Sequence, residues 1–437
     1  MFFSQARSRL LVSSAAVTTT ALLLGGCGGS EQPSGPVTLS ILVDSTETTM
    51  KTVKALTDAF TAAHPDITFS LEVRPQGSEG DNVTKTRLQT GDMTDLFYYN
   101  SGSLLQALAP EQTLVDLSGE SFMAAVDDTF KKGVSAGSGV YGVPVGNAMG
   151  GGVLYNKKIY QQLGLQVPKT WDEFMANNKK IKDAGQVPVI QTYGTDSTWT
   201  SQLFVLGDYY NVQTAVPGWA DKFTANQAHF ADTPAARAGF EHLQSVHAAG
   251  YMNSDFGSAT YADGVKKIAT GEGAHYPMLT FAITEIKSNY PANLDDVGFF
   301  AIPGNDASKA GMTTWLSAAF YLPKSTKHLD AAKQFLAFVA SPQGCDAQTT
   351  AVGVTGPYFV KGCALPSDLP PAVKDLQAYF DAGKAFPALE FLSPVKGPSL
   401  EQITVQVGSG ISTAAEGAAL YDEDVKKQAQ QLGLKGW

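Results

Sequence analysis

Apolar residues recur with the periods of strands and helices from residue 37 onward. Residues 37–43 form an apolar run typical of a buried strand, and residues 67–73 alternate between apolar and polar side chains as a second strand does. Between them, apolar residues at every third or fourth position predict a helix over 49–64. The same patterns predict a helix at 81–90 and a strand at 95–99. This alternation predicts an α/β fold, with a mostly parallel sheet and helices on both faces.

Polar residues lie at the ends of these predicted strands. Residues 44–47, 76–77 and 100–101 follow the three strands in turn. Ligands of open α/β sheets bind beyond the carboxyl ends of the strands, so these loops are predicted to share one rim. The candidate ligand contacts in and beside them are Ser45, Glu47, Asn100 and Asp95. Asp95 stands at the start of its strand, and a structural role is the alternative interpretation of that residue.

The stretch from residue 139 to residue 174 is the part around which the rest of the chain is organised. It predicts a short buried strand at 140–145 and a second strand at 150–156, followed by a helix that Gly164 ends. Thr170 and Glu173 have the spacing of a capping box, in which each side chain satisfies a free backbone amide of the next helix.

The order of segments in this stretch resembles one protein family. YGVP at 141–144 is followed by VLYNKKIYQQLGL at 153–165 and PKTWDEF at 168–174. This order is similar to that of the extracytoplasmic sugar-binding proteins of ABC importers, of the maltose-binding-protein type. Residues 60–73 and 90–108 also resemble early segments of that family.

The resemblance implies a periplasmic-binding-protein-like fold, with two α/β lobes, a hinge and a ligand cleft between the lobes. It implies that residues 37–145 and 297–341 form the N-terminal lobe. Residues 146–296 and 342–437 then form the C-terminal lobe, and the strand expected from Val297 returns the chain to the first lobe.

The second half of the chain continues this pattern. A strand is predicted at 186–190. Helices are predicted at 233–249, 261–270 and 329–341. The resemblance also exposes a departure, because His275 stands where the family usually has Met and Phe281 stands near a usual Trp position.

The first 36 residues read as a targeting segment and a tether. Arg7 and Arg9 precede a mildly apolar run that is too short to span a membrane. Leu24-Gly25-Gly26-Cys27 resembles a lipobox, which predicts a signal peptide at 1–26, a lipid on Cys27 and a flexible tether over 27–36. The chain is therefore expected at the cell membrane, anchored by lipid on the extracytoplasmic face. An ordinary secretory signal with an incidental cysteine is the alternative.

Two of the three cysteines remain after Cys27 is assigned to the lipid. Export places Cys345 and Cys363 in an oxidising compartment, where such a pair is expected to form a disulfide. The alternative is two buried free thiols.

Composition and charge limit the classes of function. At 437 residues and 43% hydrophobic content, the chain is long enough for two lobes and is not of a disordered type. A formal net charge of -10 argues against nucleic acid as a partner, because phosphates require a basic surface. No feature of the sequence predicts a cofactor or a metal site, and a monomer is expected.

Two short motifs imitate those of enzymes. Residues 133–137 match the GxSxG pattern around Ser135, but a polar segment precedes the serine where a hydrolase needs a strand. Residues 137–142 match GxGxxG but continue into a strand, so no helix N-terminus meets a phosphate. The first motif is predicted to be a surface hairpin, and no catalytic residue is expected.

The remaining candidate contacts are aromatic or amide side chains. Sugar rings stack on aromatic rings and offer hydroxyls to amide and carboxylate partners. The candidates of this kind are Trp199, Phe281, Trp315, Tyr358 and Asn147.

These residues and the resemblance together predict capture of a mono- or oligosaccharide outside the membrane and its delivery to an ABC permease. A non-sugar solute such as a polyamine is one alternative ligand. A membrane-anchored enzyme that acts on glycans is the other alternative.

Overall fold

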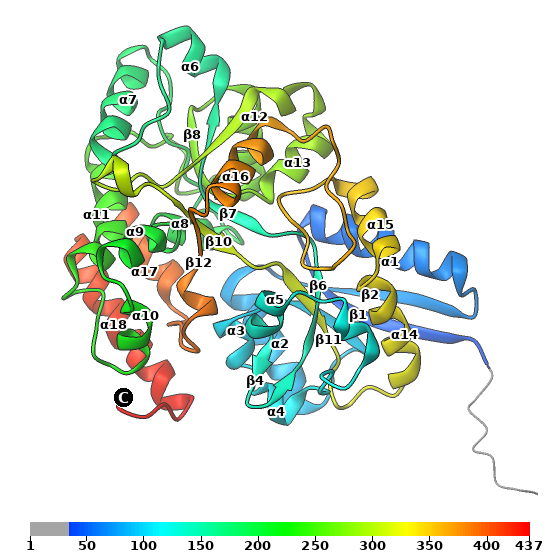
Figure 1. Cartoon of the computed structure of the whole chain (residues 1–437). Helices are drawn as coiled ribbons and strands as arrows, with labels where there is room; N and C mark the ends of the chain where they lie inside the picture. Colours follow the sequence, from blue (N-terminus) through cyan, green and yellow to red (C-terminus); the bar gives the residue numbers. More distant parts are fainter. Residues whose placement is uncertain (1–34) are drawn as a thin grey trace, which may run out of the picture. The chain divides into compact units, whose positions relative to one another are not determined.

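The computed structural model describes residues 35–437. The predicted signal peptide, the predicted lipid site at Cys27 and the tether up to residue 34 lie outside the described residues. From Val37 to Trp437 the chain is one compact unit that contains two large sheets (Figure 1). In the described part of the chain, no helix combines the length and the apolar character that a membrane crossing requires.

The first sheet has the strand order β2-β1-β3-β11-β6. Its strands are β1 (Val37–Asp44), β2 (Ile67–Arg74), β3 (Leu96–Tyr99), β6 (Gly142–Val145) and β11 (Ala318–Tyr321). β1 pairs in parallel with β2 and β3, whereas β11 runs antiparallel to β3 and β6. Ile41 and Leu42 of β1 are both buried, although successive side chains of a strand point to opposite faces. Burial of both faces is what helices on both sides of a sheet produce, as the sequence predicts.

Helices from the first part of the chain, together with α14 and α15, complete this lobe. Its helical segments are α1 (Glu47–Ala63), α2 (Gly77–Thr90), α3 (Ser103–Gln106), α4 (Pro110–Thr113), η1 (Ser121–Ala124), α5 (Asp128–Gly133), α14 (Leu329–Val339) and α15 (Pro342–Val352). The GxSxG lookalike forms a two-stranded hairpin of β4 (Ser135–Ala136) and β5 (Gly139–Val140), which confirms the predicted hairpin.

The second sheet is built around β7 (Met149–Asn156). β7 pairs antiparallel with β8 (His275–Leu279), β9 (Val297–Ala301) and β10 (Met312–Trp315), and β12 (Ala385–Pro387) joins β10. The prediction of a strand at 186–190 is wrong. In that segment only Val189 pairs with other backbone, through isolated bridges to Met252 and His275.

Helices surround this second sheet. They are α6 (Lys157–Leu163), α7 (Trp171–Asp183), α8 (Leu203–Gly207), α9 (Tyr209–Ala215), α10 (Trp219–Thr224), α11 (Pro234–Ala248), α12 (Tyr261–Thr270), α13 (Ala282–Asn289), α16 (Pro371–Asp381), α17 (Leu400–Gly408) and α18 (Ala414–Gln431). The 3-10 turns among them are η2 (Thr198–Gln202), η3 (Pro291–Asp296), η4 (Ala307–Lys309) and η5 (Leu389–Phe391).

The predicted capping box before α7 is only half formed. The Thr170 hydroxyl accepts from the Glu173 amide at 3.3 Å, as expected. The Glu173 carboxylate, however, accepts from the amide of Lys169 at 2.6 Å and not from that of Thr170. The spacing of the two residues therefore predicts the start of the helix correctly, while the reciprocal bond shifts by one residue.

The pairing of strands alters the expected lobe boundaries at two places. The strand from Val297 was expected to return to the first lobe, but β9 pairs with β7 in the second sheet. The chain returns between β10 and β11, through Leu316 and Ser317. α15 was expected in the C-terminal lobe, but it packs along α1 of the first lobe, and both helices lie together in Figure 1.

A disulfide joins Cys345 of α15 to Cys363, 18 residues later, which confirms the predicted pair. It closes the segment that carries Val360, whose backbone bridges Val126 in the first lobe. Reduction of this bond is expected to lower the free energy of unfolding by about 3 kcal/mol, because the cross-link restricts the unfolded chain. Denaturant unfolding with and without reductant measures this effect. The double variant Cys345→Ser/Cys363→Ser is the control, since it should not respond to reductant; equal stability of oxidised and reduced protein would contradict the prediction.

Candidate functional site

A cavity of about 620 Å³ lies where segments of both lobes meet. This volume is in the range that small-molecule sites usually have. The rim residues of the first sheet that line it are Asp44, Thr46, Gln76, Gly77, Asn100 and Ser101. Asp44 is the last residue of β1, and the others follow β1, β2 or β3. The carboxyl ends of the three strands therefore share one rim, as the sequence predicts.

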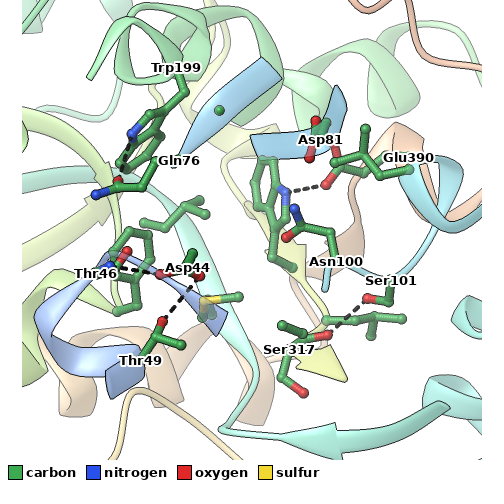
Figure 2. Close-up of a pocket in the computed structure, with 18 of the residues that line it drawn as sticks. Asp44, Thr46, Thr49, Gln76, Asp81, Asn100, Ser101, Trp199, Ser317 and Glu390 are labelled. Carbon is green, nitrogen blue, oxygen red and sulfur yellow. Dashed lines mark hydrogen bonds between the residues drawn. The ribbon is translucent and has the colours of Figure 1, made fainter. Parts of the chain in front are cut away.

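One wall of the cavity is aromatic. Trp199, on η2, has its ring centroid 6.0 Å from that of Phe281 and 5.4 Å from that of Tyr261. The indole nitrogen of Trp199 donates to Gln76 Oε1 across 3.2 Å, a contact between the two lobes that Figure 2 shows. Aromatic rings fixed in this way offer a flat apolar surface together with polar edges.

A second indole is fixed on the floor of the cavity. Trp315 ends β10 and is 5% exposed. Its Nε1 donates to Glu390 Oε1 at 2.8 Å, and the Lys396 ammonium lies 3.1 Å from the other oxygen of that carboxylate. The ring lies against Gly151 of β7, where an added Cβ would come within 2.1 Å of ring atom Cζ3. Glycine at this position is therefore required for the observed place of the indole.

Charged side chains of both signs line the cavity. Burial raises the pKa of Asp81, and the guanidinium of Arg74 opposes that shift. Arg74 itself is buried, donates to the Pro75 carbonyl at 3.1 Å and lies over the ring of Tyr99. The Asp44 carboxylate accepts from the amide of Thr46 at 2.8 Å, which orients it at the end of β1.

Several buried polar atoms of lining residues have no hydrogen-bond partner among the described residues. They are Arg74 Nε, Ser103 Oγ, Asn147 Nδ2 and Ser317 Oγ. A buried polar atom without a partner costs about 1–3 kcal/mol, so a ligand that supplies partners gains affinity from them. The backbone carbonyl of Ser317 already accepts from Ser101 Oγ at 2.9 Å, which fixes the segment between the lobes beside these atoms (Figure 2).

Contacts between the lobes also occur near the start of α2. Glu401 Oε1, on α17, accepts from the backbone amide of Ser78 at 3.2 Å. Gln402 Nε2 donates to the hydroxyl of Ser78 at 3.2 Å. The amide and the hydroxyl of Ser78 are therefore both bound by the second lobe, which joins the two lobes beside the cavity.

Residues 44–344 match the family described as bacterial extracellular solute-binding protein. The chain belongs to this family. The match begins at the last residue of β1 and includes the other four strands of the first sheet. It also includes β7, β8, β9 and β10 of the second sheet, with the aromatic and rim residues up to Trp315.

Individual relatives of this solute-binding protein are distant in sequence. The multiple sugar-binding protein of Streptococcus mutans serotype c is 24% identical over 319 residues, or 71% of this chain and 72% of the relative. The diacetylchitobiose binding protein DasA of Streptomyces coelicolor is 29% identical over 191 residues, or 43% of each chain. A solved chitin oligosaccharide binding protein matches with a TM-score of 0.76 at 22% identity, covering 90% of this chain and 99% of that one. This last likeness shows the two-lobed fold.

The structure brings five of the nine predicted contact residues to the cavity. They are Asn100, Asn147, Trp199, Phe281 and Trp315. The lining does not include Ser45, Glu47, Asp95 or Tyr358. Ser45 and Glu47 belong to the predicted rim, but their neighbours Asp44 and Thr46 line the cavity in their place.

The contacts of the excluded residues explain their positions. Asp95 precedes β3 at the end of the strand away from the rim, and its carboxylate accepts from Ser40 and Thr326. The Tyr358 hydroxyl donates to the backbone carbonyl of Cys345 at 3.1 Å. The backbone of Tyr358 forms a bridge with that of Asn147, so Tyr358 supports a lining residue without lining the cavity itself. Glu47 accepts from Asn289 at 3.1 Å and pairs with Lys51 on the surface.

The predicted contacts include none of the charged residues that β2, α2 and the last fifty residues contribute to the cavity. The missed lining residues that carry charge are Arg74, Asp81, Lys85, Glu390, Lys396 and Glu401. Only Arg74 stands at the end of a predicted strand, and the other five residues lie where no strand end predicts a ligand contact. No motif marks Glu390 or Glu401, which enter the cavity from a 3-10 turn and a helix of the second lobe.

Proposed function

We propose that this solute-binding protein captures an oligosaccharide outside the cytoplasmic membrane and delivers it to the permease of an ABC importer. The observation that carries the proposal is the pair of indoles, Trp199 and Trp315, that line one cavity together with buried polar atoms lacking partners among the described residues. Aromatic faces cover the C–H faces of sugar rings, while amides, hydroxyls and carboxylates bind the hydroxyl groups.

The names of the relatives support a carbohydrate ligand. One relative is named for multiple sugars and another for diacetylchitobiose. A cavity of about 620 Å³ is large enough for more than one sugar unit, which favours an oligosaccharide over a single monosaccharide.

The charges of the cavity do not favour a polycation. Glu390 is paired with Lys396, and the Asp81 carboxylate lies within the field of Arg74. Asp44 and Glu401 accept hydrogen bonds from amides and a hydroxyl of the protein. All four lining carboxylates therefore already have partners in the protein, whereas a polyamine site needs carboxylates free to pair with the ligand. The same pairing leaves Glu390 unsuited to act as an acid or a nucleophile on a glycan, so capture without catalysis is proposed.

A thermal-shift screen tests the proposed ligand class. Mono- to tetrasaccharides, with putrescine and spermidine as non-sugar controls, are added to the mature protein. A ligand at about a hundred times its Kd stabilises the folded state by about 2.7 kcal/mol, so a cognate sugar raises Tm. A rise with the polyamines and with none of the sugars would overturn the proposal.

Attachment to the membrane through Cys27 belongs to the same proposal. Mass spectrometry of membrane-extracted protein is expected to find diacylglycerol on Cys27 as the first residue. The variant Cys27→Ala is expected in the soluble fraction, because no other anchor is proposed. A variant that remains as firmly bound to membranes as the wild type would contradict the lipid anchor.

A further inference from the structure

Glu390 contacts two donors at once on the floor of the cavity. One carboxylate oxygen accepts from the indole of Trp315 at 2.8 Å, and the other lies 3.1 Å from the ammonium of Lys396. The Glu390 and Lys396 side chains are only 10% and 14% exposed, respectively. A charge-assisted hydrogen bond in such a shielded place is about twice as strong as a neutral one.

Three contacts together fix the pose of the Trp315 ring. The ring lies so close to Gly151 that no side chain fits at that position. The backbone of Trp315 is held in β10 by pairing with β7. Rotation of the indole about its side-chain bonds is the freedom that remains, and the hydrogen bond from Nε1 to Glu390 removes it.

Glu390 also contacts the first lobe. An added Cβ at Gly102 would come within 2.4 Å of the backbone carbonyl oxygen of Glu390. The two lobes therefore approach closely here. Gly102 also has a φ of 75°, a conformation that favours glycine. Glu390 therefore connects the indole on the floor with the surface along which the lobes meet.

We infer that Glu390 is a positioning residue, which holds the Trp315 indole in the pose that stacks on the ligand and is itself held by Lys396. The inference rests on the proposed function for its effect on sugar affinity, and on geometry alone for the pose of the ring. Glu390 acts through Trp315, with no ligand contact of its own required.

Only a carboxylate satisfies both neighbours. The indole N–H and the ammonium are donors without acceptor capacity, so Glu390 must supply two acceptor oxygens. The variant Glu390→Gln keeps the shape of the side chain but replaces one acceptor oxygen with a donor NH₂ group. In the observed pose, in which each neighbour faces its own oxygen, one of the two neighbours then meets a donor in place of an acceptor. This substitution therefore isolates the hydrogen bonding from the packing.

A double-mutant cycle tests the inference with the sugar that gives the largest thermal shift. Glu390→Gln is expected to weaken binding about tenfold in the wild-type background, which is about 1.4 kcal/mol. In a Trp315→Phe background, where no N–H exists, the same substitution is expected to change affinity less than about twofold. Equal weakening in both backgrounds, or no weakening in either, overturns the inference.

A measurement without ligand separates this inference from the proposed function. The chain has five tryptophans, and Trp315→Phe identifies the Trp315 indole signal in the nitrogen-15 spectrum of the tryptophan side chains. Glu390→Gln is expected to move that signal and speed its exchange with solvent, leaving the other four unchanged. If no sugar binds but the signal moves, the ring pose is supported and the proposed function fails. A signal that does not move overturns the inference.

The variant Lys396→Met serves if Glu390→Gln does not fold. It removes the partner that orients the carboxylate and leaves the bond to the indole in place. The Trp315 signal is expected to move in the same direction by a smaller amount, and binding to weaken by a smaller factor. An unchanged signal in this variant overturns the part assigned to Lys396.

Discussion

Replacement of Trp199 by alanine is expected to weaken binding of the cognate oligosaccharide by about 2 kcal/mol or more, roughly thirtyfold. Trp199 lies in the cavity on a short 3-10 turn and is only partly buried. Loss of the ring removes a stacking surface for the sugar while leaving the sheet and its helices in place. The Tm of the empty protein is therefore expected to change little, and calorimetry with thermal melting of one preparation measures both effects.

Trp219 is the matched control for that experiment. It is completely buried in the second lobe, stacks on Phe223 and donates to the hydroxyl of Thr233 at 3.0 Å. Trp219→Ala is expected to cost about 3–5 kcal/mol of stability, as a large core truncation does, with little change in the affinity of the folded protein. If Trp199→Ala behaves like Trp219→Ala and binds sugar normally, Trp199 is a core residue and not a stacking surface.

The second large effect is expected in acid and depends on His275. This residue is completely buried on β8, and burial lowers its pKa from 6.5 to about 3. Its ring nitrogens contact the Tyr160 hydroxyl at 2.7 Å and Asn178 Oδ1 at 2.8 Å. The neutral ring satisfies both, with Nδ1–H donating to the amide oxygen and Nε2 accepting from the hydroxyl.

The sign of the pH effect follows from where the proton binds. Above about pH 6.5 the ring is neutral in both the folded and the unfolded chain, so it contributes no pH dependence. Below that value His275 is protonated in the unfolded chain, whereas in the folded chain it stays neutral down to about pH 3. The free energy of unfolding therefore falls as pH falls, by about 2 kcal/mol at about pH 5 for this residue.

Comparison with His275→Met isolates this contribution from those of the other titrating groups. Near neutral pH the variant is expected to be less stable, because Tyr160 and Asn178 lose their partner. The difference from the wild type is expected to shrink by about 2 kcal/mol between about pH 7 and about pH 5, since methionine does not titrate. Met278→Leu on the same strand is the control, whose difference should be independent of pH. A constant difference for His275→Met would contradict the neutral buried ring.

Much of the rim could be predicted because local sequence determines it. Asp44, Gln76 and Asn100 follow strands whose apolar pattern is clear, and a parallel sheet brings such strand ends together without any knowledge of distant contacts. The choice of side chain within a loop is less determined. Ser45 and Glu47 are the predicted contacts, yet Asp44 and Thr46 line the cavity, because adjacent residues of a loop point in different directions.

Residues that depend on contacts between distant segments could not be predicted in this way. Glu401 meets Ser78 across 323 residues of sequence, and Glu390 meets Trp315 across 75. Val189 has the apolar surroundings of a strand, but its partners give it only isolated bridges. Likewise, pairing with β7 determines which lobe β9 belongs to, and the apolar pattern of β9 alone does not reveal that pairing.

Calorimetric titration of the mature protein with carbohydrates of increasing length tests the central claim most directly. The account predicts saturable binding of one oligosaccharide per chain, absent or at least roughly thirtyfold weaker in the variant Trp199→Ala/Trp315→Ala. Trp437→Ala, which removes an indole that bonds to the Thr224 carbonyl outside the cavity, should bind as the wild type does. Undiminished binding of the sugar by the double variant, or binding of no carbohydrate by the wild type, would contradict the account.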